Sequence, residues 1–237
     1  MIKKFLRSVV LAVLSVVRRN SSPKVIFYHD IGLKYTPMGT EIGLLVSHMR
    51  LLRTGDVICF DDGFHGLYDH IGRLLEIVDL KKNRVLVFLA VRLIGTPGYL
   101  SWAEILKLRG LGVVFQNHGW QHQSLVGPVV DESPIEERDE AWYHRELIES
   151  KSVLEKHLRE RVEEFCFPVG YFSDELVERC RQAGYTRVYA SFPGSVSNSF
   201  IQPRCLVQNM SPFEMRCVLN GGMNPLAGRY YRMHHTV

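Results

Sequence analysis

Two carboxylates and two imidazoles occur at spacings that could hold a metal ion and activate water. Asp61 and Asp62 are adjacent and follow the apolar stretch VICF, and His118 and His122 lie four positions apart in NHGWQH. Two histidines and one carboxylate, with a position left for water, are typical of a catalytic zinc site. The spare carboxylate could take a proton from metal-activated water. The spacing of the histidines predicts that both lie on one helical turn, with their imidazoles pointing the same way.

Alternating strands and helices must bring these residues together. Apolar stretches typical of buried strands lie at residues 24–29, 56–60, 84–91, 112–116, 163–167, 186–190 and 203–207. Capping signals begin helices at Ser101, Ser173 and Ser211, and a long helix is expected from Ser133 to about Leu158. This alternation favours parallel strands covered by helices, and so predicts an α/β fold, a single distorted (β/α) barrel of about seven strands.

Polar residues follow several of the predicted strands directly. The first strand ends in His29 and Asp30, the second in the Asp61–Asp62 pair, and the fourth runs into the two histidines. The chemistry of such barrels lies at the C-terminal ends of the strands. We therefore expect these side chains to share one site.

Three stretches, CFDDGF, NHGWQH and FPVGYFSDELVERCRQAGY, resemble the first three motifs of the metal-dependent polysaccharide deacetylases, carbohydrate esterase family four. The resemblance covers residues 24–207 and implies a distorted barrel that hydrolyses N-acetyl groups of amino sugars. It implies that Asp61 is the general base and that Asp62, His118 and His122 bind a divalent metal, which is zinc in most members.

The third motif departs from the family pattern RPPYG, because Cys166 stands where the arginine is expected. Arg204, from a later strand, is a candidate replacement as the partner of the base; the alternative is an ordinary surface arginine. Pro168, Val169 and Tyr171 are expected at the oxyanion site and substrate groove. A backbone N–H at Val169 suffices for the oxyanion, because that group needs no particular side chain.

The general acid is the second departure. The family's leucine-x-histidine motif has no convincing copy, and MHH at residues 233–235 is a weak candidate because it lies in a basic tail. VIFYHDIG is similar to the opening Tyr-His stretch of the poly-N-acetylglucosamine deacetylase branch, in which the acid comes from the first strand. His29 is therefore the candidate acid; the alternative is a histidine that only hydrogen-bonds to backbone.

The sequence thus predicts a metal-dependent carbohydrate N-deacetylase acting on an amino-sugar glycan or glycolipid. Two alternatives stay open: a catalytically inactive carbohydrate-binding barrel, and a metal-dependent hydrolase of another amide or ester. A formal charge of +4, from 29 basic and 25 acidic residues, does not favour a nucleic-acid partner. Five cysteines without a C-x-x-C pair are expected to be reduced and buried.

The N-terminal stretch combines basic residues with an apolar run. Residues 9–17 are apolar and have Lys3, Lys4 and Arg7 before them and Arg18 and Arg19 after them. The run is too short to span a bilayer. A basic amphipathic helix in peripheral contact with a membrane through residues 1–19, or a helix packed on the domain, would both fit. We expect this segment at residues 1–22, the barrel at 23–222 and a tail at 223–237.

Overall fold

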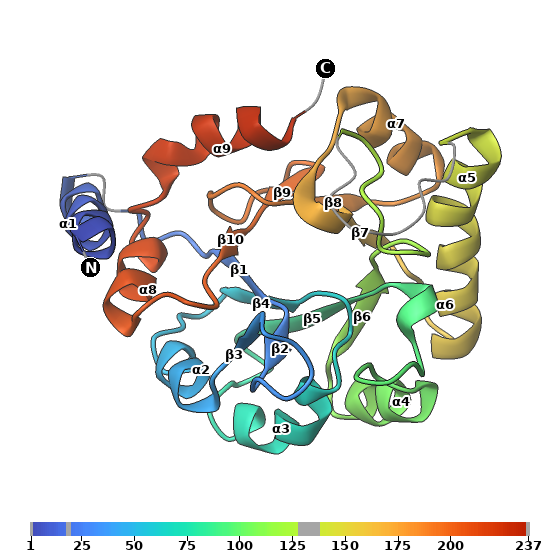
Figure 1. Ribbon diagram of the computed structural model, residues 1–237, viewed down its shortest axis with the longest axis horizontal. Helices are drawn as coiled ribbons and strands as arrows, with labels where there is room; N and C mark the ends of the chain where they lie inside the picture. Colours follow the sequence, from blue (N-terminus) through green and yellow to red (C-terminus); the bar gives the residue numbers. More distant parts are fainter. Residues whose placement is uncertain (1, 18–19, 128–137, 236–237) are drawn as a thin grey trace.

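The sheet of the molecule closes on itself as a parallel barrel. The computed structural model describes residues 2–17, 20–127 and 138–235. Within them, eight strands form one sheet in the order β10-β1-β4-β5-β6-β7-β8-β9, and helices surround it (Figure 1). The strands are β1 Val25–Tyr28, β4 Val57–Phe60, β5 Arg84–Leu89, β6 Val114–Asn117, β7 Glu164–Cys166, β8 Arg187–Ala190, β9 Ile201–Pro203 and β10 Cys205–Leu206. The predicted distorted (β/α) barrel is confirmed.

One short segment closes the barrel. Only Arg204 separates β9 from β10, so the two strands form a single extended stretch. Its first half pairs with β8, through Val188 and Ile201, and its second half pairs with β1, through Ile26 and Cys205. If β9 and β10 are counted as one strand, the described sheet has the seven strands that the sequence predicts.

Side chains alternate between the barrel interior and the layer under the helices, as the two-residue period of a strand requires. A small interior cluster consists of Val25, Phe27, Val57, Cys59, Leu86, Phe88, Cys166 and Tyr189. Their neighbours on the same strands, such as Ile26, Ile58 and Val87, belong to the larger outer core. Both faces of the sheet are therefore buried, which explains why the strands are continuous apolar runs.

The helices cover the outside of the barrel. They are α1 Ile2–Val17, α2 Ile42–Met49, α3 Gly66–Leu75, α4 Trp102–Gly110, α5 Glu140–His144, α6 Ser150–Leu158, α7 Asp174–Gln182, α8 Pro212–Leu219 and α9 Ala227–His234. Ser101, Ser173 and Ser211 cap α4, α7 and α8 as predicted. A π-helical turn, η2 Arg145–Glu149, joins α5 to α6. The expected helix start at Ser133 lies outside the described residues, and the described helix begins at Glu140.

Short segments complete the chain. Beside the barrel, β2 Asp30–Ile31 pairs with β3 Gly39–Thr40. Single 3₁₀ turns are η1 Val91–Leu93, η3 Pro168–Gly170 and η4 Asn224–Leu226. Helix α9 lies between α8 and α7 along the rim (Figure 1), and its end is tied to the chain before α7 by a hydrogen bond from Phe172 N to His234 O.

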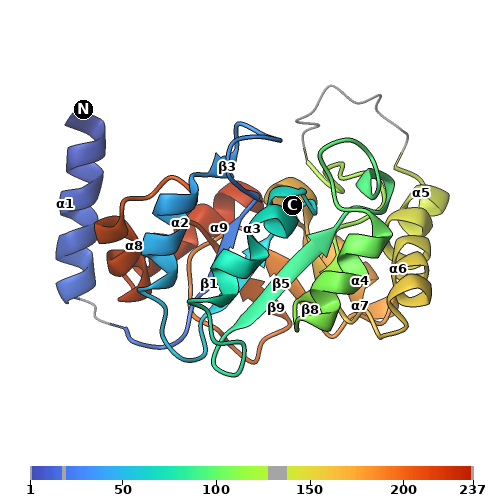
Figure 2. The same cartoon turned by 90° about the horizontal axis from the view of Figure 1, so that it is seen from below.

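Helix α1 packs on α8 and stands roughly parallel to the barrel axis (Figure 2). Leu11 and Ser15 are buried against the domain, and Ser8 Oγ donates to Glu214 Oε1 at 3.2 Å. Val9, Val13 and Val16 are exposed. The helix therefore has one face on the domain and an apolar face left open. No described helix has the length and apolar character needed to cross a bilayer.

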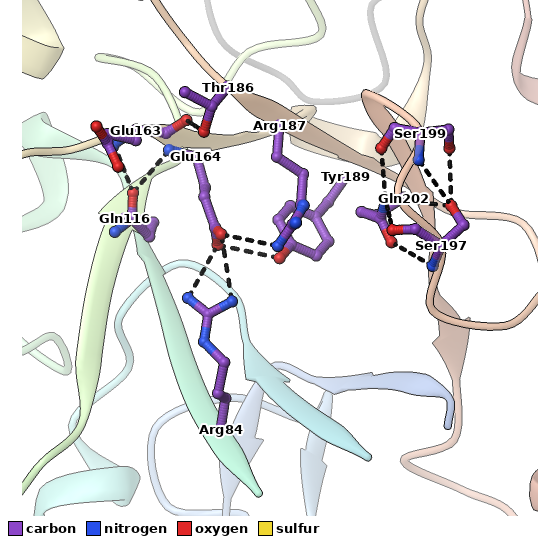
Figure 3. A network of polar contacts seen from close by, with 10 residues as sticks. All are labelled: Arg84, Gln116, Glu163, Glu164, Thr186, Arg187, Tyr189, Ser197, Ser199 and Gln202. Atoms are coloured by element: carbon purple, nitrogen blue, oxygen red, sulfur yellow. Dashed lines mark hydrogen bonds and ion pairs between the residues drawn. The ribbon is translucent and has the colours of Figure 1, made fainter. Parts of the chain in front are cut away.

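A charged network fills the barrel end opposite the candidate site, at the N-terminal ends of the strands (Figure 3). The Glu164 carboxylate accepts from Arg84 at 3.2 and 3.4 Å, from Arg187 at 3.2 Å and from Tyr189 at 3.0 Å. Three strands, β5, β7 and β8, are linked through this one carboxylate. The network connects the strands at their N-terminal ends, whereas the candidate site lies at their C-terminal ends.

Candidate metal centre and active site

Asp62, His118 and His122 converge at the C-terminal ends of β4 and β6. The Asp62 carboxylate oxygen Oδ1 lies 2.9 Å from His122 Nε2 and 3.4 Å from His118 Nε2. Asp62 and His118 are buried, and the His122 side chain is 28% exposed. The three ligand atoms lie within 4.8 Å of one another, close enough to share one ion.

The histidines do not lie on a helical turn, so that prediction is wrong. The chain after β6 is a loop in which Gly119 has φ 85° and His122 has φ 61°. Left-handed residues reverse the backbone within a few positions, and this brings His122 back beside His118. A loop thus produces the same convergence that a helix would have given.

The donor set fits a cation. The ring of His118 donates from Nδ1 to the carbonyl oxygen of Cys166 at 2.8 Å, because a carbonyl can only accept. In the neutral ring, the lone pair of Nε2 then points toward Asp62 Oδ1, a buried atom that has no hydrogen-bond partner. Two facing lone-pair atoms repel unless a positive charge lies between them. Nitrogen and carboxylate ligands with a backbone carbonyl behind the histidine are typical of zinc sites.

The electrostatics keep Asp62 ionised. Burial raises the pKa of Asp62, but the interactions with the nearby imidazoles of His122 and His118 outweigh burial and lower that pKa well below its ordinary value. A carboxylate that stays ionised is the form that binds a metal.

Asp61 faces a different partner. Arg204 donates from Nη1 and Nη2 to the two Asp61 oxygens at 2.7 and 2.9 Å, and both side chains are buried. The guanidinium also lies 4.2 Å from the centre of the Phe27 ring. Burial lowers the pKa of Arg204, but Asp61 raises it above its ordinary value, so the arginine stays charged. Of the two alternatives that the sequence left open, the structure therefore favours a buried partner of Asp61 over a surface arginine.

A second possible ligand group, Asp61, His118 and Cys166, overlaps the first. Its carboxylate is already engaged by Arg204 on both oxygens. Burial raises the pKa of the Cys166 thiol well above its ordinary value, and a metal needs the thiolate. The first group therefore fits a divalent ion better.

His29 lies on the rim after β1, and its Nδ1 is hydrogen-bonded to Gln208 Oε1 at 2.8 Å. Its partner is a side chain, not the backbone that the sequence offered as an alternative. Because an amide oxygen can only accept, Nδ1 carries the proton in the neutral ring, and Nε2 is left to exchange protons with a ligand.

The residues after β7 lie unequally near the site. Val169 has φ 61° and lines the same cavity as Asp61, His118 and His122, whereas Pro168 is buried and is not among the described residues that line it. Tyr171 is not among the described residues that line this cavity; its ring lies 5.5 Å from that of His234. His234 itself, from the stretch that the sequence made a weak candidate, lines the cavity.

Comparison with known proteins decides the family. The family model for polysaccharide deacetylases matches residues 56–188, more than half of the chain. The chain belongs to the polysaccharide deacetylase family. The matched region includes Asp61, Asp62 and both histidines, whereas His29 and Arg204 lie outside it.

Relatives of this deacetylase-family chain share its fold at low sequence identity. The structure of IcaB from Ammonifex degensii is 18% identical, with a TM-score of 0.69 over 85% of this chain and 98% of that one. BC0361, a polysaccharide deacetylase from Bacillus cereus, is 18% identical, with a TM-score of 0.67 over 84% and 69%. YxkH of Bacillus subtilis (strain 168) is 21% identical over 71% of this chain, which spans 56% of that protein.

Two polar residues of this deacetylase-family chain that support the histidine loop escaped the sequence analysis. Glu146, fully buried in η2, accepts from Trp120 N at 2.7 Å and from Gln121 N at 3.3 Å. Asn117 accepts from Gly119 N at 2.9 Å and donates to Tyr185 OH at 2.6 Å. No local motif could have revealed Glu146, because its contact with the Gln121 N–H spans 25 residues. A fully buried glutamate is unusual, but its burial cannot be seen in the sequence.

Proposed function

We propose that this chain is a metal-dependent hydrolase that removes N-acetyl groups from an amino sugar in a glycan or glycolipid. The supporting observation is the convergence of Asp62, His118 and His122 beside a second carboxylate, Asp61, that has its own buried cation. A ligand set and a separate proton acceptor are the two parts that amide hydrolysis by activated water requires.

The roles follow from where each group lies. A divalent ion, zinc by the donor set, would be held by Asp62, His118 and His122 and would supply Lewis acidity to water and to the substrate carbonyl. Asp61, fixed through both oxygens by Arg204, accepts the proton of the attacking water. Val169 lines the same cavity, which supports its backbone N–H as the oxyanion donor.

His29 completes the reaction by giving a proton to the leaving nitrogen. Gln208 holds the His29 ring by Nδ1, so that Nε2 can act as the acid. The balanced reaction is an amide plus water giving acetate and an ammonium group. The chain's own residues therefore supply a base, an oxyanion donor and an acid around one carbonyl carbon.

The experiment compares metal binding with turnover. Asp62→Ala should abolish both zinc binding by calorimetry and acetate release from chitooligosaccharides. Asp61→Asn should keep zinc binding and reduce turnover by about 10²–10⁴-fold, the range for losing a general base. Asp79→Ala, at an exposed site, is the matched control. Acetate release by zinc-free Asp62→Ala at the rate of the unmodified chain would refute the proposal.

A further inference from the structure

A cavity of about 500 Å³ opens from the candidate site. His29, Asp61, His118 and His122 line one part of it. The remaining wall extends over the strand ends toward β10 and α9, and consists mostly of apolar side chains, including Met38, Phe167, Val169, Leu206, Met210 and Met223.

The volume far exceeds what an acetyl group fills. An apolar cavity of roughly 150 Å³ holds benzene, with its six carbons. A cavity of about 500 Å³ therefore has space for a chain of several carbons as well as the reacting amide. The methyl of an acetyl group would leave most of this wall without a contact.

The wall chemistry favours an alkyl chain over a sugar ring. Among the described lining residues outside the proposed catalytic set, the polar side chains are those of Ser191, Tyr230 and His234, and His234 Nδ1 is already bonded to Tyr230 O at 2.9 Å. A pyranose buried there would leave hydroxyl groups without partners, and each such group would lose its hydrogen bonds to water without replacement. Methylene groups need no partner and gain from leaving water.

The shape indicates which end of the substrate enters. Met210 and Met223 are buried, at 8% and 7% exposed, whereas Met38 and Leu206 on the same wall are 41% and 42% exposed, and α9 lies along the rim beside it (Figure 1). The two buried methionines mark an inner part of the cavity that suits the end of a molecule better than the middle of a polymer. In an N-acyl amine the acyl chain is that end, because the rest of the substrate continues from the nitrogen.

Resting on the proposed function, we propose that the preferred substrate of this site is an N-acyl amine whose acyl chain has about four to eight carbons. The chain lies in the apolar part of the cavity, between β10 and α9. Water adds to the amide carbon, the C–N bond breaks, and the products are a carboxylate and an ammonium group. The reaction is that of the deacetylase, with a longer acyl group.

The test is a chain-length series on the zinc-loaded protein. N-acetyl, N-butyryl, N-hexanoyl and N-octanoyl glucosamine are compared by release of the free amine. Each buried methylene should raise kcat/KM by up to about fourfold, so hexanoyl should exceed acetyl by at least tenfold. A series in which acetyl is fastest overturns the inference but leaves the proposed function standing. If kcat/KM rises instead when an octyl chain is attached to a sugar oxygen of N-acetylglucosamine, the inference is likewise overturned and the proposed function stands.

A variant locates the chain in this cavity. Leu206→Trp, at a position of β10 that lines the cavity, should lower kcat/KM for the hexanoyl substrate at least tenfold more than for the acetyl substrate. Leu111→Trp, at an exposed position after α4, is the matched control and should change neither. Equal effects of Leu206→Trp on both substrates would overturn the inference.

Product binding separates the two proposals. Hexanoate should bind the zinc-loaded protein at least tenfold more tightly than acetate by calorimetry. If no amide is hydrolysed but hexanoate still binds more tightly, the proposed function is wrong and the assignment of the cavity stands. If the two carboxylates bind equally, the cavity does not hold an acyl chain.

Discussion

Two neighbouring aspartates have different partners because the backbone turns sharply between them. Asp62 has φ 70° and Gly63 has φ 79°, both in the left-handed region, which Asp tolerates better than most residues. Asp61 therefore points to Arg204, and Asp62 to the imidazoles. One turn thus separates the proposed metal ligand from the proposed base.

The Asp61–Arg204 pair should behave as one buried unit. Arg204→Met leaves an uncompensated carboxylate and should lower the free energy of unfolding by about 3–5 kcal/mol in urea titrations. Combining Arg204→Met with Asp61→Asn should recover part of that loss, because the orphaned charge is removed. Zinc affinity should change little, since Arg204 contacts none of the three ligands. Additive losses in the double variant would contradict the coupling.

At this scale the sequence predicted which residue types matter, but not all of their partners. Asp61, Asp62, His118 and His122 could be found because they stand next to strands in a recognisable order. Arg204 could only be offered as a candidate, since its contact with Asp61 spans 143 residues. Gln208, which holds His29, carries no local signal at all.

The loop after β6 is held in place by hydrogen bonds to the π-helical turn η2. The loop carries both histidines without a helix of its own, and the Glu146 carboxylate in η2 accepts the backbone N–H groups of Trp120 and Gln121. A π-helical turn is often found at a functional site, because it shifts one side chain out of the regular helical register. The order of the loop therefore depends on a helix that follows it in the sequence.

Glu146→Gln should weaken zinc binding without removing a ligand. The amide oxygen can replace only one acceptor and carries no charge, so the loop should become less ordered. We expect zinc affinity to fall by about 10–100-fold, the range for lost support behind metal ligands. Glu149→Gln, on the same turn but exposed, is the control. Competition with a chelator measures both, and equal affinities would show that Glu146 does not support the site.

At the scale of elements, the sequence predicted the strands and most helix starts because apolar runs and capping boxes are local. The histidine turn was predicted wrongly. Spacing of four suits a helix, but glycine and a left-handed histidine reach the same geometry without one. The division of the last strand at Arg204 has no local signal, because it depends on which neighbour each half pairs with.

For the molecule as a whole, α1 has an apolar surface that the barrel does not cover. Val9, Val13 and Val16 are 45%, 55% and 79% exposed, and the helix stands beside the barrel with its N-terminal end on the side of the C-terminal strand ends (Figure 2). Basic residues precede and follow this stretch in the sequence. Apolar surface next to positive charge suits an anionic lipid surface.

The chain should therefore bind anionic vesicles through α1. The double variant Val9→Asp and Val13→Asp should reduce co-sedimentation with phosphatidylglycerol vesicles at least tenfold, and binding should weaken as salt rises. Leu111→Asp, at an exposed apolar position outside α1, is the control. Binding that is equal for all three proteins would place the lipid contact elsewhere, and no binding would leave α1 as a packing helix only.

The position of Arg204 between β9 and β10 has a consequence for how the protein is made. On a ribosome, the residues that would hold the ion have all been made once His122 is added, but the guanidinium for Asp61 is made only with the last strands, β9 and β10. A nascent or truncated chain could capture a metal early and still lack a correctly held base. Under the proposed function, the base would therefore be held correctly only after the barrel is complete.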